Sequence, residues 1–328
     1  MKYEIGNTLV KVLGDPHLGR RFVNNVPLDR RGEREEQVWE EFERQLHDVA
    51  DCTAHVCLGD LFDGFLVPPE VILRAAKLYK EAAERHPATQ YVVLSGNHDL
   101  SRDVERASAF DVFAELVGRQ TNLKVIKGES KTLRFGAKGD TCLGFVPWHP
   151  VKSANEMVAE LPPCDAVFVH MDLDSFGGSD HNLMPRSLLA EKTDWVIGGH
   201  VHRPLEVMDG DLRITIHGSM LPYAHGEDAT GETYVTLTLS ELKQLDPDAL
   251  QDKCVRILLL PGESLDVEIN ALQVSTKRVE IEEDAPLALN VDEFNLAELF
   301  HQVLGEMGVR AELIEQTWQH YMTLKSKV

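Results

Sequence analysis

One stretch of this sequence joins a buried strand to a loop that carries three chemically active side chains. The apolar run from Tyr91 to Leu94 is typical of a buried β-strand, and it breaks at a glycine. The loop that follows carries an amide, an imidazole and a carboxylate, on Asn97, His98 and Asp99. Such a loop fixes groups that bind metal or move protons at the mouth of a rigid strand.

Four further strand-like runs lead into polar groups of the same kind. They end at Asp15-Pro16-His17, Gly59-Asp60-Leu61-Phe62-Asp63, His170 and Gly199-His200-Val201-His202. Loop ends on one edge of a sheet converge in space, so we expect these side chains to meet in one pocket.

Hydrophobic periodicity predicts the order of the elements. Helices are expected at 33–50, after Pro68 and Pro69, and at 103–117. The later strands include those expected at 233–239, 255–260 and 265–272. Early strands alternate with helices and later ones crowd together, which predicts an α/β or α+β chain with two sheets packed face to face and helices outside.

The composition limits the classes of function. The 328 residues are 43% hydrophobic and 27% charged, as in an ordinary globular protein. No apolar run approaches the roughly 20 residues of a membrane span, and the amino terminus shows no secretory signal. Five scattered cysteines indicate reduced thiols, so a cytoplasmic protein without membrane attachment is expected.

The net charge of −21 argues against a protein that grips nucleic acid alone, because phosphate binding requires positive charge. Bound metal ions or a partner can supply that charge.

The strand-end groups mix carboxylates, imidazoles and one amide without a thiolate, which suits manganese, iron or zinc. In Asp-x-His and His-x-His both side chains project the same way from extended backbone. Two cations roughly 3.5–4 Å apart meet the needs of phosphodiester hydrolysis.

The five blocks, in this order over the first two-thirds of the chain, resemble the signature blocks of the calcineurin-like metallophosphoesterases. That resemblance implies a four-layer αββα sandwich of two mixed sheets flanked by helices. A narrower resemblance is to SbcD-type DNA-repair nucleases, including the small subunits of phage recombination endonucleases. It rests on Asp15-Pro16-His17-Leu18-Gly19, Arg34-Glu35-Glu36, Gly59-Asp60-Leu61-Phe62-Asp63 and Gly218-Ser219-Met220-Leu221-Pro222 with Glu227 and Asp228.

The resemblance also implies roles for the site residues. One metal would be held by Asp15, His17, Asp60 and His202, and the other by Asp60, Asn97, His170 and His200. Manganese is the expected ion, with magnesium, iron(II) and zinc as alternatives. His98 would contact or protonate the scissile phosphodiester, and Asp99 would orient its imidazole. Asp63 stands where many SbcD-type chains carry a histidine and is a further catalytic candidate. A basic loop contains five arginines, which would either contact a DNA backbone or be exposed to solvent: Arg20, Arg21, Arg30, Arg31 and Arg34.

The implied function is a DNA nuclease subunit with 3′-to-5′ exonuclease and endonuclease activity, working with an SbcC-type coiled-coil ATPase. A small-molecule phosphodiesterase or phosphatase of the same superfamily is the alternative. Residues 1–275 would form the nuclease domain, and 276–328 a linker and a helix-turn-helix segment that docks on a partner or folds onto its own core. A cap domain is expected to be short or absent. Homodimerisation is a family expectation, as is the cytoplasm of a bacterium or of a phage-infected host.

Overall fold

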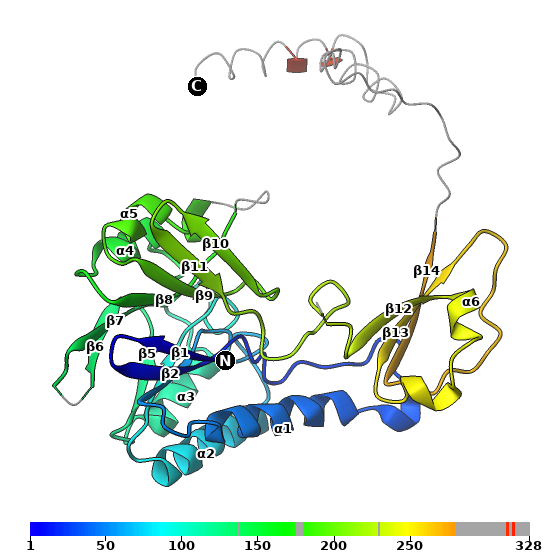
Figure 1. Cartoon of the computed structure of the whole chain (residues 1–328), viewed down its shortest axis with the longest axis horizontal. Helices are drawn as coiled ribbons and strands as arrows, with labels where there is room; N and C mark the ends of the chain where they lie inside the picture. The colour runs from blue at the N-terminus through cyan, green and yellow to red at the C-terminus, as the bar shows by residue number, and fades with distance from the viewer. Residues whose placement is uncertain (137, 175–179, 229, 280–312, 315–316, 319–328) are drawn as a thin grey trace. The chain divides into compact units, whose positions relative to one another are not determined.

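The computed structural model describes residues 1–328 except 137, 175–179, 229, 280–312, 315–316 and 319–328. Its first sheet has five strands in the order β1-β2-β3-β4-β5, and only the β1–β2 pair is antiparallel (Figure 1). These strands are β1 (Lys2–Ile5), β2 (Thr8–Leu13), β3 (Ala54–Cys57), β4 (Gln90–Leu94) and β5 (Leu123–Ile126).

The second sheet has six strands in the order β10-β11-β9-β8-β7-β6. Its central strands are parallel, and antiparallel β6 and β10 close the two edges. The strands are β6 (Lys131–Phe135), β7 (Thr141–Val146), β8 (Ala166–His170), β9 (Trp195–Gly199), β10 (Leu205–Asp209) and β11 (Leu212–Ile216).

The two sheets pack face to face through alternate residues of their strands. On β4, Val92 and Leu94 join Phe168 of β8 in the core between the sheets. Tyr91 and Val93 face the other way, into a core built with three helices on the outer side. Because both faces are buried, the strands read as continuous apolar runs, as the sequence shows.

Helices cover the outer face of each sheet and complete the predicted four αββα layers. The core of the first sheet includes side chains of α1 (Glu33–His47), α2 (Pro69–Arg85) and α3 (Ala109–Val117). The core of the second sheet includes side chains of α4 (Ala154–Ala159) and α5 (Arg186–Ala190). The predicted fold class is therefore confirmed. Within the described ranges, no helix has the length and apolar character needed to cross a membrane.

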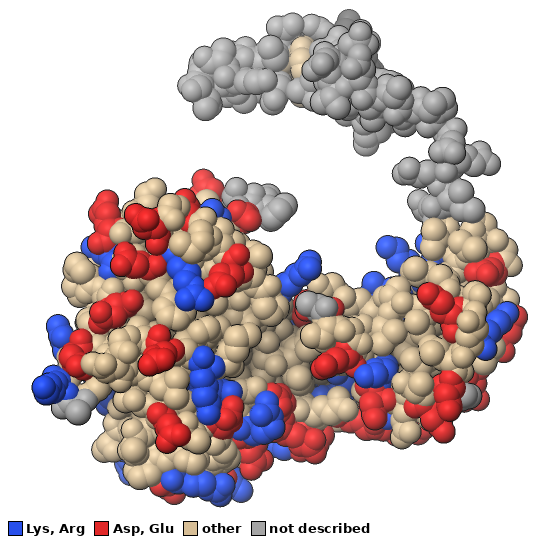
Figure 2. Space-filling view, in the orientation of Figure 1, with Lys and Arg blue, Asp and Glu red and all other residues tan. Residues whose placement is uncertain are grey.

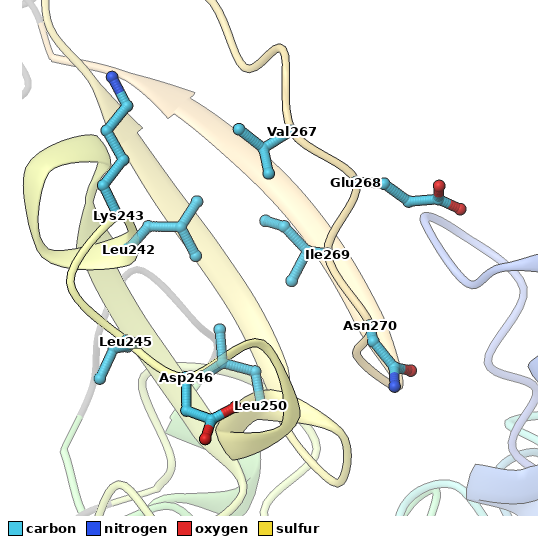
Figure 3. Close-up of a pocket in the computed structure, with 9 residues that line it drawn as sticks. All are labelled: Leu242, Lys243, Leu245, Asp246, Leu250, Val267, Glu268, Ile269 and Asn270. Carbon is cyan, nitrogen blue, oxygen red and sulfur yellow. The ribbon is translucent and has the colours of Figure 1, made fainter.

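Residues 232–279 form a small module after the two-sheet sandwich, in the region where only a short cap or none is expected. Its three parallel strands are β12 (Tyr234–Thr238), β13 (Cys254–Leu259) and β14 (Gln273–Arg278), with α6 (Leu239–Leu242) and a 3₁₀ turn (Pro247–Leu250). The strand expected at 265–272 is wrong. Its alternating apolar residues, such as Val267 and Ile269, line a hollow of about 80 Å³ instead of pairing with β13 (Figure 3).

One further difference has a local cause. The helix expected from residue 103 begins at Ala109, because Ser108 and Asp111 form a capping box there. The hydrophobic pattern did not predict β1, β10 or the short helices α4, α5 and α6. The chain divides into the units Met1–Val279 and Glu280–Val328. The expected helix-turn-helix segment falls in the second unit and lies almost wholly outside the described residues.

Candidate metal centre

Loops from both sheets bring one carboxylate and two imidazoles together as a first cluster (Asp15, His17 and His202). The first two residues follow β2, and His202 follows β9. Nε2 of His17 lies 3.0 Å from Nε2 of His202, which in turn lies 3.7 Å from Oδ2 of Asp15. One ligand atom from each of the three lies within 4.8 Å of the others.

A second cluster contains a carboxylate, an amide and two imidazoles (Asp60, Asn97, His170 and His200). Oδ1 of Asn97 lies 2.9 Å from Nε2 of His170 and 2.8 Å from Nδ1 of His200. Oδ2 of Asp60 lies 3.4 Å from the same His170 nitrogen. Asp60 and Asn97 follow strands of the first sheet, whereas the histidines belong to β8 and the loop after β9.

Asp60 lies between the two clusters. Its Oδ2 is 3.8 Å from Nε2 of His17, a member of the first cluster, and it also approaches His170 in the second. The other oxygen, Oδ1, accepts a hydrogen bond from the backbone N–H of His98 at 2.8 Å. The seven predicted metal ligands therefore meet in one place, and each cluster draws on both sheets.

The donor atoms suit divalent cations. Ligands that share one ion at about 2.1 Å lie about 3 Å apart, as do the facing nitrogens of His17 and His202. Asp15 is fully buried, and its Oδ1 accepts no hydrogen bond from the described residues. Burial, with the neighbouring charge of Asp60, raises the pKa of Asp15 well above its usual value. A cation held by Asp15, His17 and His202 would offset the cost of burying this negative charge.

Carboxylates also hold the imidazoles from their outer side. The Asp172 carboxylate lies 2.6 Å from Nε2 of His200, and Glu227 lies 3.1 Å from Nδ1 of His202. Burial lowers the pKa of His200, but the hydrogen bond and charge of Asp172 outweigh burial and raise it. Sequence reasoning missed Asp172. Its place two residues after His170, on the same side of an extended segment, was the available signal.

His98 is exposed at the margin of the clusters, and the structure corrects the partner expected for it. Nδ1 of His98 lies 2.8 Å from the backbone carbonyl of Asp63, so Asp63 and not Asp99 orients the ring. Asp99 is fully buried and accepts hydrogen bonds from the backbone N–H groups of Leu61, Phe62 and Gly96. It therefore joins two of the site loops. The Asp63 carboxylate lies 3.4 Å from Nδ1 of His17.

Several site residues adopt backbone conformations that L-amino acids avoid. His17, Asp60 and His200 have φ of 46°, 47° and 77°, and they are three of the five non-glycine residues with positive φ in the described part of the chain. Such residues cost roughly 1–3 kcal/mol each and cluster at functional sites. At Gly96 a Cβ would lie 2.1 Å from Oδ1 of Asp60, so only glycine lets the two loops approach.

The expected DNA-contacting arginines do not act as one group. Arg20 lies at the site, with Nη1 3.5 Å from Oδ1 of Asp63 and its guanidinium 5.0 Å from the Tyr223 ring centre. Arg30 pairs with Glu33 and donates to the Gln251 carbonyl of the small module. Arg34 is buried and donates to Pro222 and Tyr234, so it is not a solvated residue. The exposed members are Arg21 and Arg31.

The layered sandwich and the histidine–carboxylate site at its strand ends define a metallophosphoesterase. Residues 8–204 match the model of the calcineurin-like phosphoesterase family, and the chain belongs to that family.

Among known proteins, the DNA double-strand break repair protein Mre11 of Methanopyrus kandleri is 26% identical over 225 residues, which are 64% of this chain and 47% of that protein. The match thus spans about half of that relative's length. Among solved structures, phosphopantetheinyl hydrolase from Mycobacterium tuberculosis is 11% identical, with a TM-score of 0.40, over 64% of this chain and 89% of its own. GAP50, the anchor in the inner membrane complex of Plasmodium, is 17% identical, with a TM-score of 0.38, over 64% and 71%.

Proposed function

We propose that this chain is a metal-dependent DNA nuclease subunit that hydrolyses phosphodiester bonds. The observation that carries the proposal is the position of the Asp60 carboxylate, whose Oδ2 lies 3.8 Å from Nε2 of His17 in the first cluster and 3.4 Å from Nε2 of His170 in the second. The exposed His98 imidazole lies beside His17 and Asp60. The similarity to a double-strand break repair protein supports DNA as the substrate.

In this proposal Asp15, His17 and His202 hold one divalent cation, Asn97, His170 and His200 hold a second, and Asp60 binds both. Manganese is the first candidate, and magnesium, iron(II) and zinc are alternatives. When bound, such a pair supplies Lewis-acid polarisation of the phosphodiester and an acidified water as nucleophile. Asp172 and Glu227 fix the ring orientations of His200 and His202, so the ligand nitrogens are in place before substrate arrives.

His98 supplies the proton for the leaving oxygen. A backbone carbonyl only accepts hydrogen bonds, so the contact with Asp63 requires the proton on Nδ1 of His98. Nε2 of the same ring is then the atom that faces substrate, and in the protonated imidazole it donates to the departing oxygen. Asp99 and Asp63 act as positioning residues, since their contacts are with loop amides and neighbouring imidazoles.

A partner supplies most of the affinity for DNA. On the face in Figure 2, Lys and Arg side chains are interspersed with Asp and Glu, and the whole chain carries a net charge of −21. Exposed Arg21 and Arg31, with Arg20 at the site, offer only a few backbone contacts. We assign the remaining contacts to an SbcC-type ATPase, with 3′-to-5′ exonuclease and endonuclease action in cytoplasmic DNA end processing. A homodimer is the proposed assembly.

The test is manganese-dependent cleavage of an end-labelled duplex, with and without the ATPase, beside a cyclic nucleotide and a generic phosphodiester. His98→Ala should abolish cleavage while the manganese stoichiometry stays unchanged, and His86→Ala, remote from the clusters, should leave both intact. Cleavage at the wild-type rate by His98→Ala would disprove the role of His98 as proton donor. Hydrolysis of cyclic nucleotides without cleavage of duplex, even with the ATPase present, would instead favour the small-molecule phosphodiesterase.

A further inference from the structure

Two cysteines from segments on either side of α4 have their sulfur atoms in contact. Cys142 lies near the start of β7, and Cys164 lies two residues before β8. The Cys142 thiol points at the Sγ of Cys164, and the two sulfur atoms are 3.9 Å apart. Disulfide bonds are about 2.05 Å long, so about 2 Å of sulfur movement would bring the pair to bonding distance.

The backbone already holds the two segments together. The N–H of Asp165 donates to the Cys142 carbonyl at 2.8 Å, and the N–H of Cys142 donates to Oδ2 of Asp165 at 2.7 Å. On the other side, the N–H of Cys164 donates to the Lys192 carbonyl at 2.7 Å. A bond between the sulfurs would therefore link segments that are neighbours without it.

The pair also differs from the other cysteines in its exposure. Both Cys142 and Cys164 are half-buried, whereas Cys52, Cys57 and Cys254 are buried. A small thiol reagent can reach the first two in the folded protein. Burial, and then the neighbouring Cys142, raise the pKa of the Cys164 thiol to about 12, so the reaction should be slow at neutral pH.

We propose that Cys142 and Cys164 are a thiol–disulfide modification site that reacts with low-molecular-weight disulfides. The Cys142 thiolate attacks one sulfur of an external disulfide such as oxidised glutathione, and one glutathione thiolate leaves. Cys164 then attacks Sγ of Cys142, the mixed disulfide breaks, and the second glutathione departs with the proton of Cys164. Two protein thiols are oxidised, and one external disulfide is reduced to two thiols.

The position of the bond predicts its effect. Cys142 and Cys164 lie at the starts of two parallel strands, whereas the metal-centre residue His170 lies at the opposite end of β8. The bond would close a loop that contains β7 and α4 without touching a member of either cluster. The oxidised protein should therefore be more resistant to unfolding than the reduced protein, with an unchanged manganese stoichiometry.

The experiment equilibrates the full chain with mixtures of oxidised and reduced glutathione, then counts accessible thiols and measures intact mass. We expect two thiols to disappear together with the loss of two hydrogens and no glutathione adduct. The thermal midpoint should rise by about 5 °C or more relative to the reduced protein.

Three variants make the result specific. Cys142→Ser and Cys164→Ser should each prevent the loss of two hydrogens, whereas the control Cys254→Ser should retain it. Circular dichroism of each variant checks that the fold persists, and Cys→Ala replaces Cys→Ser where it does not. A stable glutathione adduct on the wild-type pair would overturn the proposal. So would the same loss of two hydrogens in Cys164→Ser. Neither result depends on the nuclease activity.

Discussion

The Asp172 carboxylate lies 2.6 Å from Nε2 of His200, while the other nitrogen of that ring faces the Asn97 side chain at 2.8 Å. Removing the charge in Asp172→Asn should let the imidazole rotate and reduce its basicity, and manganese affinity should fall roughly 10–100-fold at the second cluster. Manganese titration by calorimetry measures this. Asp174→Asn, an exposed carboxylate paired with Arg186, is the matched control. Equal affinities for the two variants would contradict the orienting role.

Gly96→Ala tests the close approach of the two site loops. The new Cβ would meet Oδ1 of Asp60 at 2.1 Å, so the shared carboxylate must shift. We expect a loss of roughly 1–3 kcal/mol in stability and weaker manganese binding at both clusters. Gly64→Ala is the control, because the nearest atom to its Cβ lies at 3.8 Å. Chemical denaturation and manganese titration of the pair decide the matter, and a Gly96→Ala protein with unchanged manganese binding would disprove it.

His55 should make the protein less stable in acid. Burial, with the nearby charge of Lys11, lowers the pKa of His55 to about 3, against 6.5 for an ordinary histidine. As pH falls below 6.5, the unfolded chain takes up a proton that the folded chain refuses. Stability is thus complete above pH 6.5 and is lost progressively towards pH 3, at up to about 1.4 kcal/mol per pH unit.

His55→Leu should reduce that slope by the contribution of His55. It should also raise stability at neutral pH, since neither ring nitrogen of His55 has a hydrogen-bond partner among the described residues. The measurement is the free energy of unfolding in urea at several pH values from 5 to 7. A variant whose pH slope equals that of the wild type would exclude the buried neutral histidine. His217, with a pKa of about 3 for the same first cause, accounts for part of the remaining slope.

Arg34 should stabilise the contact between the small module and the sandwich. It donates to the Pro222 carbonyl and the Tyr234 hydroxyl, both at 3.2 Å. Arg34→Met should cost about 1–3 kcal/mol in unfolding free energy, because it leaves buried acceptors unpaired. Arg31→Met, at an exposed position in the same segment, should be neutral within about 0.5 kcal/mol. If both substitutions have the same effect, Arg34 has no such role.

The positions of most strands along the chain and the convergence of their loops could be predicted because both follow from local signals. Apolar runs buried on two faces mark strands, and glycine with polar residues marks their ends. His170 and Asn97 are 73 positions apart in sequence, yet their contact at 2.9 Å follows from that reasoning.

Other features depend on which residues meet across the fold. Arg34 lies in the first turn of the amphipathic helix α1, a position that the sequence predicts to be solvent-exposed. Its contacts with Pro222 and with Tyr234 of the small module bury it instead. Asp99 follows a histidine and was expected to orient it, but the loop geometry aims its carboxylate at backbone amides. Apolar and polar residues alternate over 265–272 as they do in a strand. The structure places these residues in a coil whose apolar side chains line a hollow of the small module.

Each cluster takes members from both sheets, and this division bears on synthesis of the chain. A nascent polypeptide that has emerged as far as Ile126 carries every strand of the first sheet, yet it lacks His170, His200 and His202. It therefore contains Asp15, His17, Asp60, Asn97 and His98, but not the three histidines that complete the two clusters. We therefore expect a chain that ends before residue 202 to bind manganese weakly and to lack the proposed activity.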